Sequence, residues 1–255
     1  MYSNTQVAEL WEARAKTLNA ILEFIDRAVD HPYRTDRGRE FGRHGLCRRL
    51  QVLHRSLGRV FELIPPKSRQ LPGKQRREDA EIYFSSFLIA TYGAIDNLAW
   101  IWTIETGLTK SNGQPLARSQ IGLRPENEVV VGSLPTAIQA KLRDFSKWFE
   151  QNSDYRHALA HRIPPYVPPY AVSPRNVAED AALDADILAA AVDGNSALVQ
   201  KLRRRQRRVR AFVPVIQHSW GDKATPIKFH ATLVADSRTV IDLASDIFDA
   251  LRSRN

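Results

Sequence analysis

Two arginines and two histidines stand within seven residues of one otherwise apolar stretch. The segment reads Arg156-His157-Ala158-Leu159-Ala160-His161-Arg162. Like charges at helical spacing repel by roughly a few tenths of a kcal/mol per pair, so this crowding is unusual for a purely structural helix. The pattern therefore favours a negatively charged ligand, and a phosphodiester is the first candidate.

Three interpretations of this cluster compete. In a metal site, His157 and His161 would form the i, i+4 pair of a zinc motif. That is the weakest interpretation, because Ala158 replaces the expected glutamate and the flanking arginines would repel a cation. In a structural interpretation, the cluster forms a group of salt bridges between helices, and the histidine rings fill gaps in the packing. In a nuclease, arginine binds and neutralises the phosphate while histidine moves a proton, and no metal is needed.

Helical geometry limits how these side chains can meet. At about 100° per residue, His157 and His161 lie only about 40° apart, whereas Arg156 lies about 140° from His161. Arg156 must curl around the helix, or the helix must loosen ahead of Pro164, which disfavours α geometry before it. In a third arrangement, Arg156 reaches the histidine of a second subunit.

An acidic residue on the preceding apolar helix could belong to the same site. Asp96 follows Tyr92 by four residues, so the two share a helix face. A buried carboxylate without a partner is costly, and Arg156 or His157 is the natural candidate for that partner. The alternative is that Asp96 faces solvent or caps a kink at Gly93.

The rest of the sequence predicts helices separated by proline and glycine punctuation. Helices are expected over 5–29, 46–64, 78–106, 177–191, 196–210 and 229–252. A fourth helix in chain order begins near Pro135 and runs to His161, unless it pauses and restarts at Asn152-Ser153. Basic loops are expected over 33–43 and 67–77, irregular chain over 108–133, and polyproline-II-like chain over 164–170. The sequence predicts an all-α fold and gives no convincing linker, so residues 1–255 are taken as a single domain.

The motif resembles that of the HEPN superfamily, in which Arg is followed after four to six residues by His, often with a polar residue directly after the Arg. Arg156, His157 and His161 match it, within the wording Tyr-Arg-His-Ala-Leu-Ala-His-Arg-Ile-Pro-Pro-Tyr. The resemblance implies an up-and-down helical bundle with a core at about 78–165 and a helical extension at about 176–255. It also implies Arg156 on the scissile phosphate, His161 as acid/base, His157 as a supporting group and Asp96 as an added acidic residue.

The resemblance carries further expectations about function. Many such proteins are homodimers that cleave RNA without metal or cofactor, in toxin–antitoxin, phage-defence and RNA-processing systems. It therefore implies a metal-independent endoribonuclease with RNA as substrate, the Arg/His segments near the two-fold axis, and an antitoxin-like protein partner. Other members have the fold without nuclease activity, so a non-catalytic RNA- or protein-binding module is the alternative.

Composition agrees with a polyanionic partner. The chain has 37 Lys and Arg against 28 Asp and Glu, a net charge of +9, which favours nucleic acid or a membrane surface over acidic proteins. The apolar window 82–104 is long enough to test for membrane insertion, but its polar residues favour a buried helix, so no membrane is expected. The single cysteine, Cys47, excludes an intrachain disulfide and fits a reducing, cytoplasmic location. The N-terminus lacks the pattern of a signal peptide.

The densest run of charge is 201–210. With Arg162, its arginines are the predicted RNA contacts, namely Arg203, Arg204, Arg205, Arg207 and Arg208. The alternative is a solvated helix face paired with acids such as Glu179, Asp180 and Asp184. His218, Trp220 and His230 are interpreted as packing and capping residues around a turn at Gly221-Asp222.

Overall fold

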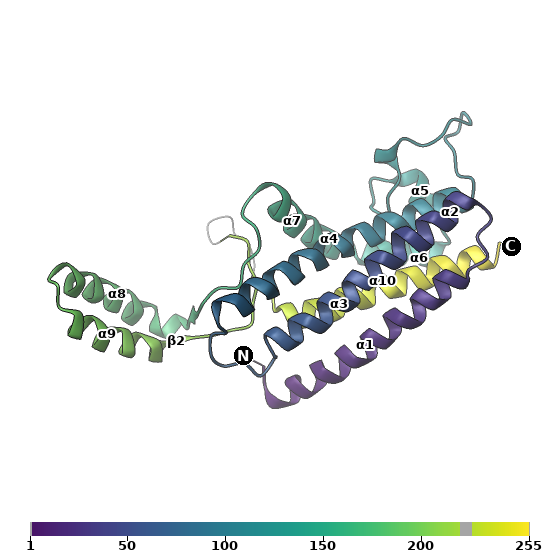
Figure 1. Cartoon of the computed structure of the whole chain (residues 1–255). Helices are drawn as coiled ribbons and strands as arrows, with labels where there is room; N and C mark the ends of the chain where they lie inside the picture. Colours follow the sequence, from purple (N-terminus) through teal and green to yellow (C-terminus); the bar gives the residue numbers. More distant parts are fainter. Residues whose placement is uncertain (1, 220–225, 255) are drawn as a thin grey trace.

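The computed structural model describes residues 2–219 and 226–254. Its largest part is a bundle in which helices from both ends of the chain pack together (Figure 1). The bundle helices are α1 (Asn4–Asp30), α3 (Cys47–Leu63), α4 (Lys74–Glu105) and α10 (Phe229–Arg252). Helix α10 contacts α1, α3 and α4, and α3 also contacts α1 and α4. The predicted all-α class is confirmed, and the bundle includes the C-terminal helix as well as the motif-bearing region.

Helix α1 shows how local signals and burial agree in this bundle. Ser3 caps its N-terminus, where the Ser3 hydroxyl accepts from the Gln6 backbone at 3.2 Å and the Gln6 side chain accepts from the Ser3 backbone at 2.9 Å. Such a capping box satisfies two amide groups that the helix itself leaves unpaired. Ile21 and Phe24, one helical turn apart, are buried against the other helices. The helix predicted over 5–29 is confirmed.

Helix α4 is the central helix of the bundle. Its length and apolar composition would suffice to cross a membrane, but 67% of its most apolar window is buried inside the fold. Phe87, Leu98 and Trp102 are fully buried against neighbouring helices. This burial explains the apolar sequence of α4 as that of a core helix.

The basic loop predicted over 33–43 is wrong, because helical structure begins at Asp36. Helix α2 (Asp36–Glu40) leads into η1 (Phe41–Leu46), a π-helical turn that continues into α3. The turn is anchored by Glu105 at the end of α4, which accepts from the Arg34 backbone at 2.6 Å and from the Thr35 hydroxyl at 2.7 Å. A tertiary anchor of this kind overrides a local sequence rich in arginine and glycine.

The helix predicted from Pro135 to His161 is interrupted, but not at Asn152-Ser153. It consists of α6 (Thr136–Asp144) and α7 (Ser146–His161), with the break at Phe145. Asn152 lies inside α7, where its side chain donates to the Trp148 carbonyl at 3.2 Å instead of capping a new helix. The region predicted as irregular contains two short helices, η2 (Arg118–Gln120) and α5 (Glu128–Ser133).

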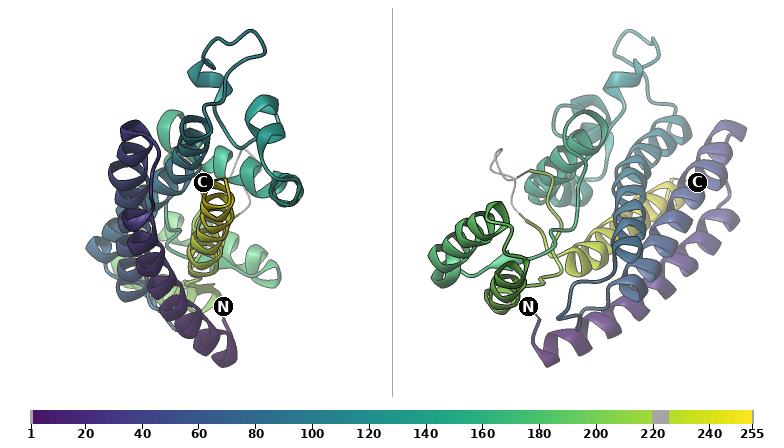
Figure 2. Two further views of the ribbon diagram at one scale, coloured as in Figure 1. Left: turned by 90° about the vertical axis from the view of Figure 1, so that its right-hand side faces the viewer. Right: turned by 60° about the vertical axis from the view of Figure 1, so that its left-hand side comes forward.

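A helical hairpin projects from the bundle (Figures 1 and 2). It consists of η3 (Pro174–Asn176), α8 (Val177–Val192) and α9 (Ser196–Val209), and its base is closed by strands β1 (Ala171–Val172) and β2 (Arg210–Ala211). The segment 164–170 ahead of it is non-helical, as predicted. His218 and His230 are buried, which fits their interpretation as packing residues. Trp220 and the turn at Gly221-Asp222 lie outside the described residues.

One carboxyl group of α10 is enclosed by the protein. Asp236 is 5% exposed, and the Trp148 indole donates to its Oδ1 at 2.8 Å. Burial raises the pKa of Asp236 to about 7, because the charged form loses its hydration and the hydrogen bonds only partly compensate. The folded state therefore holds this proton at pH values where the unfolded chain releases it.

We predict that Asp236→Asn makes the fold less sensitive to alkaline pH. The raised pKa means that the wild-type protein loses stability as pH rises from about 4 towards 8, with roughly 2–3 kcal/mol of that loss falling between pH 5 and pH 8. Asparagine has no proton to lose and can still accept from Trp148. Urea unfolding of both proteins at pH 5 and pH 8 measures the difference. An equal pH dependence in the two proteins would contradict the assignment.

Candidate functional site

Arg156 extends from α7 towards α4 and lies over an aromatic ring. Its Cζ is 4.6 Å from the centroid of the Tyr92 ring, and the Cζ of Arg124 is 4.8 Å from the same centroid. Arg124 comes from the chain between η2 and α5 and also donates a short hydrogen bond to Ser153 of α7. Attraction between guanidinium and ring thus gathers two cations at one point of α4.

Asp96 lies one helical turn beyond Tyr92, in the field of these cations. The surrounding protein raises the pKa of Asp96 by desolvation, and the positive charges of Arg124, Arg49 and Arg156 lower it without cancelling that effect. Within the described ranges, no cationic group comes within ion-pair distance of Asp96. Asp96 is exposed to solvent, as one of the two predicted alternatives has it. Arg156, which the other alternative names as a partner, acts on Asp96 only through its charge.

Arg49 reaches this region from α3 because Gly93 of α4 leaves room for the Arg49 side chain to cross α4. Its Nε donates to the Asn97 side chain at 2.8 Å. A Cβ at Gly93 would lie only 2.2 Å from the Arg49 Cζ. Gly45 in η1 makes a second close approach, since a Cβ there would lie 2.8 Å from the Asn97 amide nitrogen. Sequence reasoning missed Arg49 and Arg124. Gly93 and Asn97 mark a polar, close-packed point in the apolar helix, but no local pattern identifies the two arginines that reach this region.

Depressions lie on both sides of this part of α4. One pocket of about 270 Å³ lies between α4, α7 and the chain at 118–127, and its lining includes Tyr92, Asp96 and Arg124. The other, of about 620 Å³, includes Arg49 and Leu159 in its lining. Small-ligand pockets usually span about 300–1,000 Å³, so the larger depression lies within this range and the smaller one just below it.

The two histidines lie on a different side of α7 from Arg156. His157 and His161 are both exposed, with ring centroids 6.2 Å apart. Helix α7 stays α-helical through His161, and Arg156 extends to Tyr92, so neither loosening of the helix nor curling of the arginine is present. No hydrogen bond joins Arg156 to His161 in the part of the chain that the structure describes. The structure thus contradicts the two arrangements within one chain, and contact with a second subunit stays a prediction.

Arg162 is engaged in a network at the end of α7. It forms a short ion pair with Asp154, whose other oxygen lies 2.8 Å from the Nε2 of the buried His218. Desolvation alone would raise the pKa of Asp154, but the hydrogen bonds from Arg162 and His218 lower it. In this conformation Arg162 is tied back to Asp154 of its own helix, and Asp154 in turn connects α7 to His218 in the chain ahead of α10.

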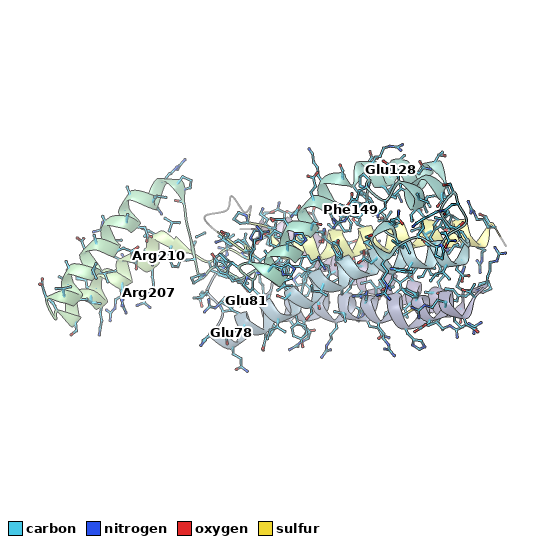
Figure 3. The ribbon with its side chains drawn as sticks, turned by 90° about the horizontal axis from the view of Figure 1, so that it is seen from above. Glu78, Glu81, Glu128, Phe149, Arg207 and Arg210 are labelled. Carbon is cyan, nitrogen blue, oxygen red and sulfur yellow. The ribbon has the colours of Figure 1, made fainter. Side chains whose placement is uncertain are left out.

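The arginines of α9 divide into two groups. Arg205 pairs with Glu179 at 2.8 Å, and Arg210, which follows α9, pairs with Asp180 at 2.6 Å and Asp184 at 2.8 Å, as the structural alternative expected. The other group is exposed and makes no ion pair within residues 2–219 and 226–254. It consists of Arg203, Arg204, Arg207 and Arg208. Figure 3 shows Arg207 and Arg210 on the hairpin, well separated from Phe149 in the pocket region of the bundle.

Comparison with known proteins does not identify the function of this site. Comparisons with protein-family models, curated proteins and solved structures gave no match. Among the described residues, no three His, Cys, Asp or Glu side chains are gathered closely enough to hold a metal ion. The groups of the region that can take part in chemistry are its arginines, its histidines and Asp96.

We predict that Gly93→Ala raises the pKa of Asp96. The added methyl group must displace the Arg49 guanidinium, which removes one of the positive charges that lower this pKa. A carbon-detected NMR titration of the labelled carboxyl group measures the shift. Gly132→Ala is the matched control, because nothing lies within 4 Å of a Cβ at Gly132. An unchanged Asp96 titration in Gly93→Ala would contradict the assigned role of Arg49.

Proposed function

We propose that this protein is a metal-independent endoribonuclease of the HEPN type. The observation that carries the proposal is the convergence of Arg156, Arg124 and Arg49 on Tyr92 and Asp96, directly beside a helix that bears two exposed histidines. Guanidinium groups match the geometry of phosphate oxygens and keep their charge at all relevant pH values. Exposed imidazoles can transfer protons near neutral pH.

The proposed reaction needs only groups of this chain and the RNA. The 2′-hydroxyl attacks the adjacent phosphorus, the bond to the 5′-oxygen breaks, and the products are a 2′,3′-cyclic phosphate and a 5′-hydroxyl. Arg156 stabilises the charge on the phosphate oxygens. His161 transfers the proton that leaves the 2′-hydroxyl or joins the 5′-oxygen, and His157 supports it. Tyr92 holds Arg156 in place, and Asp96 acts on Arg156 only through the field of its charge.

We place the complete site between two copies of the chain. Because Arg156 and His161 are on different sides of α7, a phosphate bound at Arg156 can meet the His161 of a partner subunit without any change in the helix. Apolar side chains exposed near Leu159, including Val52 and Ile89, offer surface for such a contact. A homodimer also follows from the resemblance of the motif.

We predict that the protein cleaves single-stranded RNA in the presence of EDTA. Arg156→Ala and His161→Ala should each reduce the rate by roughly 100-fold or more, because each removes charge stabilisation or proton transfer in the transition state. Arg143→Ala, an exposed arginine on α6, is the matched control and should keep the wild-type rate. Product analysis should show 2′,3′-cyclic phosphate ends. Cleavage that requires a divalent metal would contradict the mechanism.

We predict that the two inactive variants complement each other when mixed. A mixed dimer of Arg156→Ala and His161→Ala has one site with both side chains and one site with neither. After subunit exchange, half of the dimers are mixed, so the rate should recover to about a quarter of the wild-type value. No recovery, despite exchange verified with differently labelled subunits, would show that the site is not shared between subunits.

A non-catalytic HEPN-like module that binds RNA or protein is the second candidate. The observation that favours it is the separation of Arg156 from His161 within one chain, together with the uncompensated arginines of α9. Salt-sensitive RNA binding without cleavage would support this module. A cytoplasmic location, a role in toxin–antitoxin or phage-defence systems and an antitoxin-like partner remain part of the proposal through the resemblance of the motif.

A further inference from the structure

A groove of about 1,060 Å³ separates the α8–α9 hairpin from the bundle. Its walls come from the connection between α3 and α4, the proline-rich chain ahead of β1, and the hairpin itself. The lining residues that matter for its chemistry are Arg69, Tyr170, Asp184, Arg203, Arg207 and Arg210. The groove is distinct from the pockets beside Asp96, with which it shares no lining residue.

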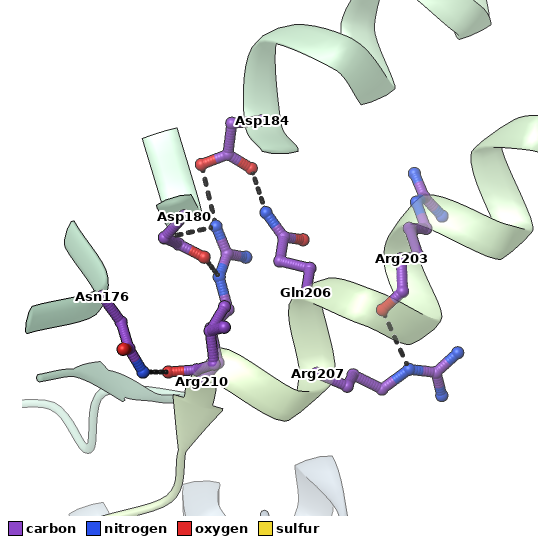
Figure 4. Close-up of polar contacts among 8 residues, drawn as sticks. Asn176, Asp180, Asp184, Arg203, Gln206, Arg207 and Arg210 are labelled. Carbon is purple, nitrogen blue, oxygen red and sulfur yellow. Dashed lines mark hydrogen bonds and ion pairs between the residues drawn. The ribbon is translucent and has the colours of Figure 1, made fainter. Parts of the chain in front are cut away.

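The groove has uncompensated positive charge on two walls. Arg203 and Arg207 lie one helical turn apart on α9, and Figure 4 shows their guanidinium groups extending away from the carboxylate of Asp180. Arg69 stands on the opposite wall. All three arginines are exposed, and none makes an ion pair within the described part of the chain. Three cations around one cleft favour a ligand with several negative charges.

The side of the groove formed by Arg210 is fixed by hydrogen bonds. Arg210 donates to Asp180 at 2.6 Å and to Asp184 at 2.8 Å, and Gln206 donates to the other oxygen of Asp184 at 2.6 Å. Tyr170 is 39% exposed, and the Arg210 Cζ lies over one face of its ring, 3.9 Å from the centroid. The acids are therefore satisfied within the hairpin, and a partly open aromatic ring stands beside the free arginines.

We propose that this groove binds the backbone of single-stranded RNA, as a second binding site distinct from the cleavage site. The identification of the ligand as RNA rests on the proposed function. Cationic side chains beside an exposed aromatic ring are the pattern for single strands, whose unpaired bases can stack on the ring while the phosphates meet the cations. Arg203 and Arg207 are then the important arginines of α9, because Arg204 and Arg208 point to another side of the helix and Arg205 is paired with Glu179.

The test is RNA binding by the full-length chain with His161→Ala, so that the probe is not cut. The probe is a labelled single-stranded RNA of about 16 nucleotides, followed by fluorescence anisotropy at several salt concentrations. Arg203→Glu with Arg207→Glu should weaken binding by 10-fold or more. It should also reduce the slope of log K against log salt by about 1.4, or about 0.7 for each lost phosphate contact.

Arg204→Glu with Arg208→Glu is the matched control, since it makes the same change of charge on the same helix outside the groove. Its effect should be clearly smaller. Tyr170→Ala should weaken binding by roughly 5-fold or more, whereas Tyr170→Phe keeps the ring and should bind nearly as the parent does. If the glutamate variants fail to fold, as judged by circular dichroism, the corresponding glutamine pairs replace them.

The outcomes separate this inference from the proposed catalysis. Equal weakening by the two arginine pairs would overturn the groove, because charge on the hairpin would then act without regard to position. Preference for duplex RNA of the same length would also overturn it. If the wild-type chain cuts no RNA but the groove pair still controls binding, the groove stands and the catalytic proposal fails. If RNA is cut and the groove pair has no special effect, the reverse holds.

Discussion

The contact of the Arg156 guanidinium with the Tyr92 ring is the interaction on which the candidate site depends. Phe149, Tyr155 and Ala158 form the buried side of α7, and the Arg156 contact beside them brings a permanent positive charge into the neighbourhood of Asp96. With that side fixed, helical geometry places His161 on another side, because about 140° separates the two positions. This separation is the reason that we propose a site shared between two subunits.

Small residues in α4 make this contact part of a larger arrangement. Gly93 allows Arg49 of α3 to lie across the helix and reach Asn97, so α3, α4 and α7 all supply groups to one region. Guanidinium groups repel each other, and their proximity is tolerated because Tyr92 and Asp96 provide opposite electrostatic character. Like charges gathered in one region are costly for stability on their own, so their presence in the bundle favours a functional explanation.

Sequence patterns predicted the elements whose burial follows a helical period. The ends of α1, α3 and α10 follow from apolar spacing and from punctuation by proline. Three-dimensional packing decided the rest. The turn around α2 depends on Glu105, which is about 70 residues away in the chain, and the break at Phe145 has no strong signal of its own. For the site, the motif drew attention to Arg156, and a carboxylate in an apolar helix drew attention to Asp96. Arg49 and Arg124 come from distant segments that no local pattern connects.

In the hairpin, the acidic residues of α8 decide which arginines of α9 are compensated. At about 100° per residue, Arg205 faces the acids of α8, while the sequence Arg203, Arg207, Arg204, Arg208 and Lys201 spreads over about 160° of the helix. Acidic residues of α8 thus neutralise the side that packs, and they leave the remaining side charged. Such a division keeps a two-helix unit with a small buried interior folded, because the packed side carries ion pairs and not repulsion. It also leaves uncompensated arginines together on one side of α9, where a polyanion can reach them.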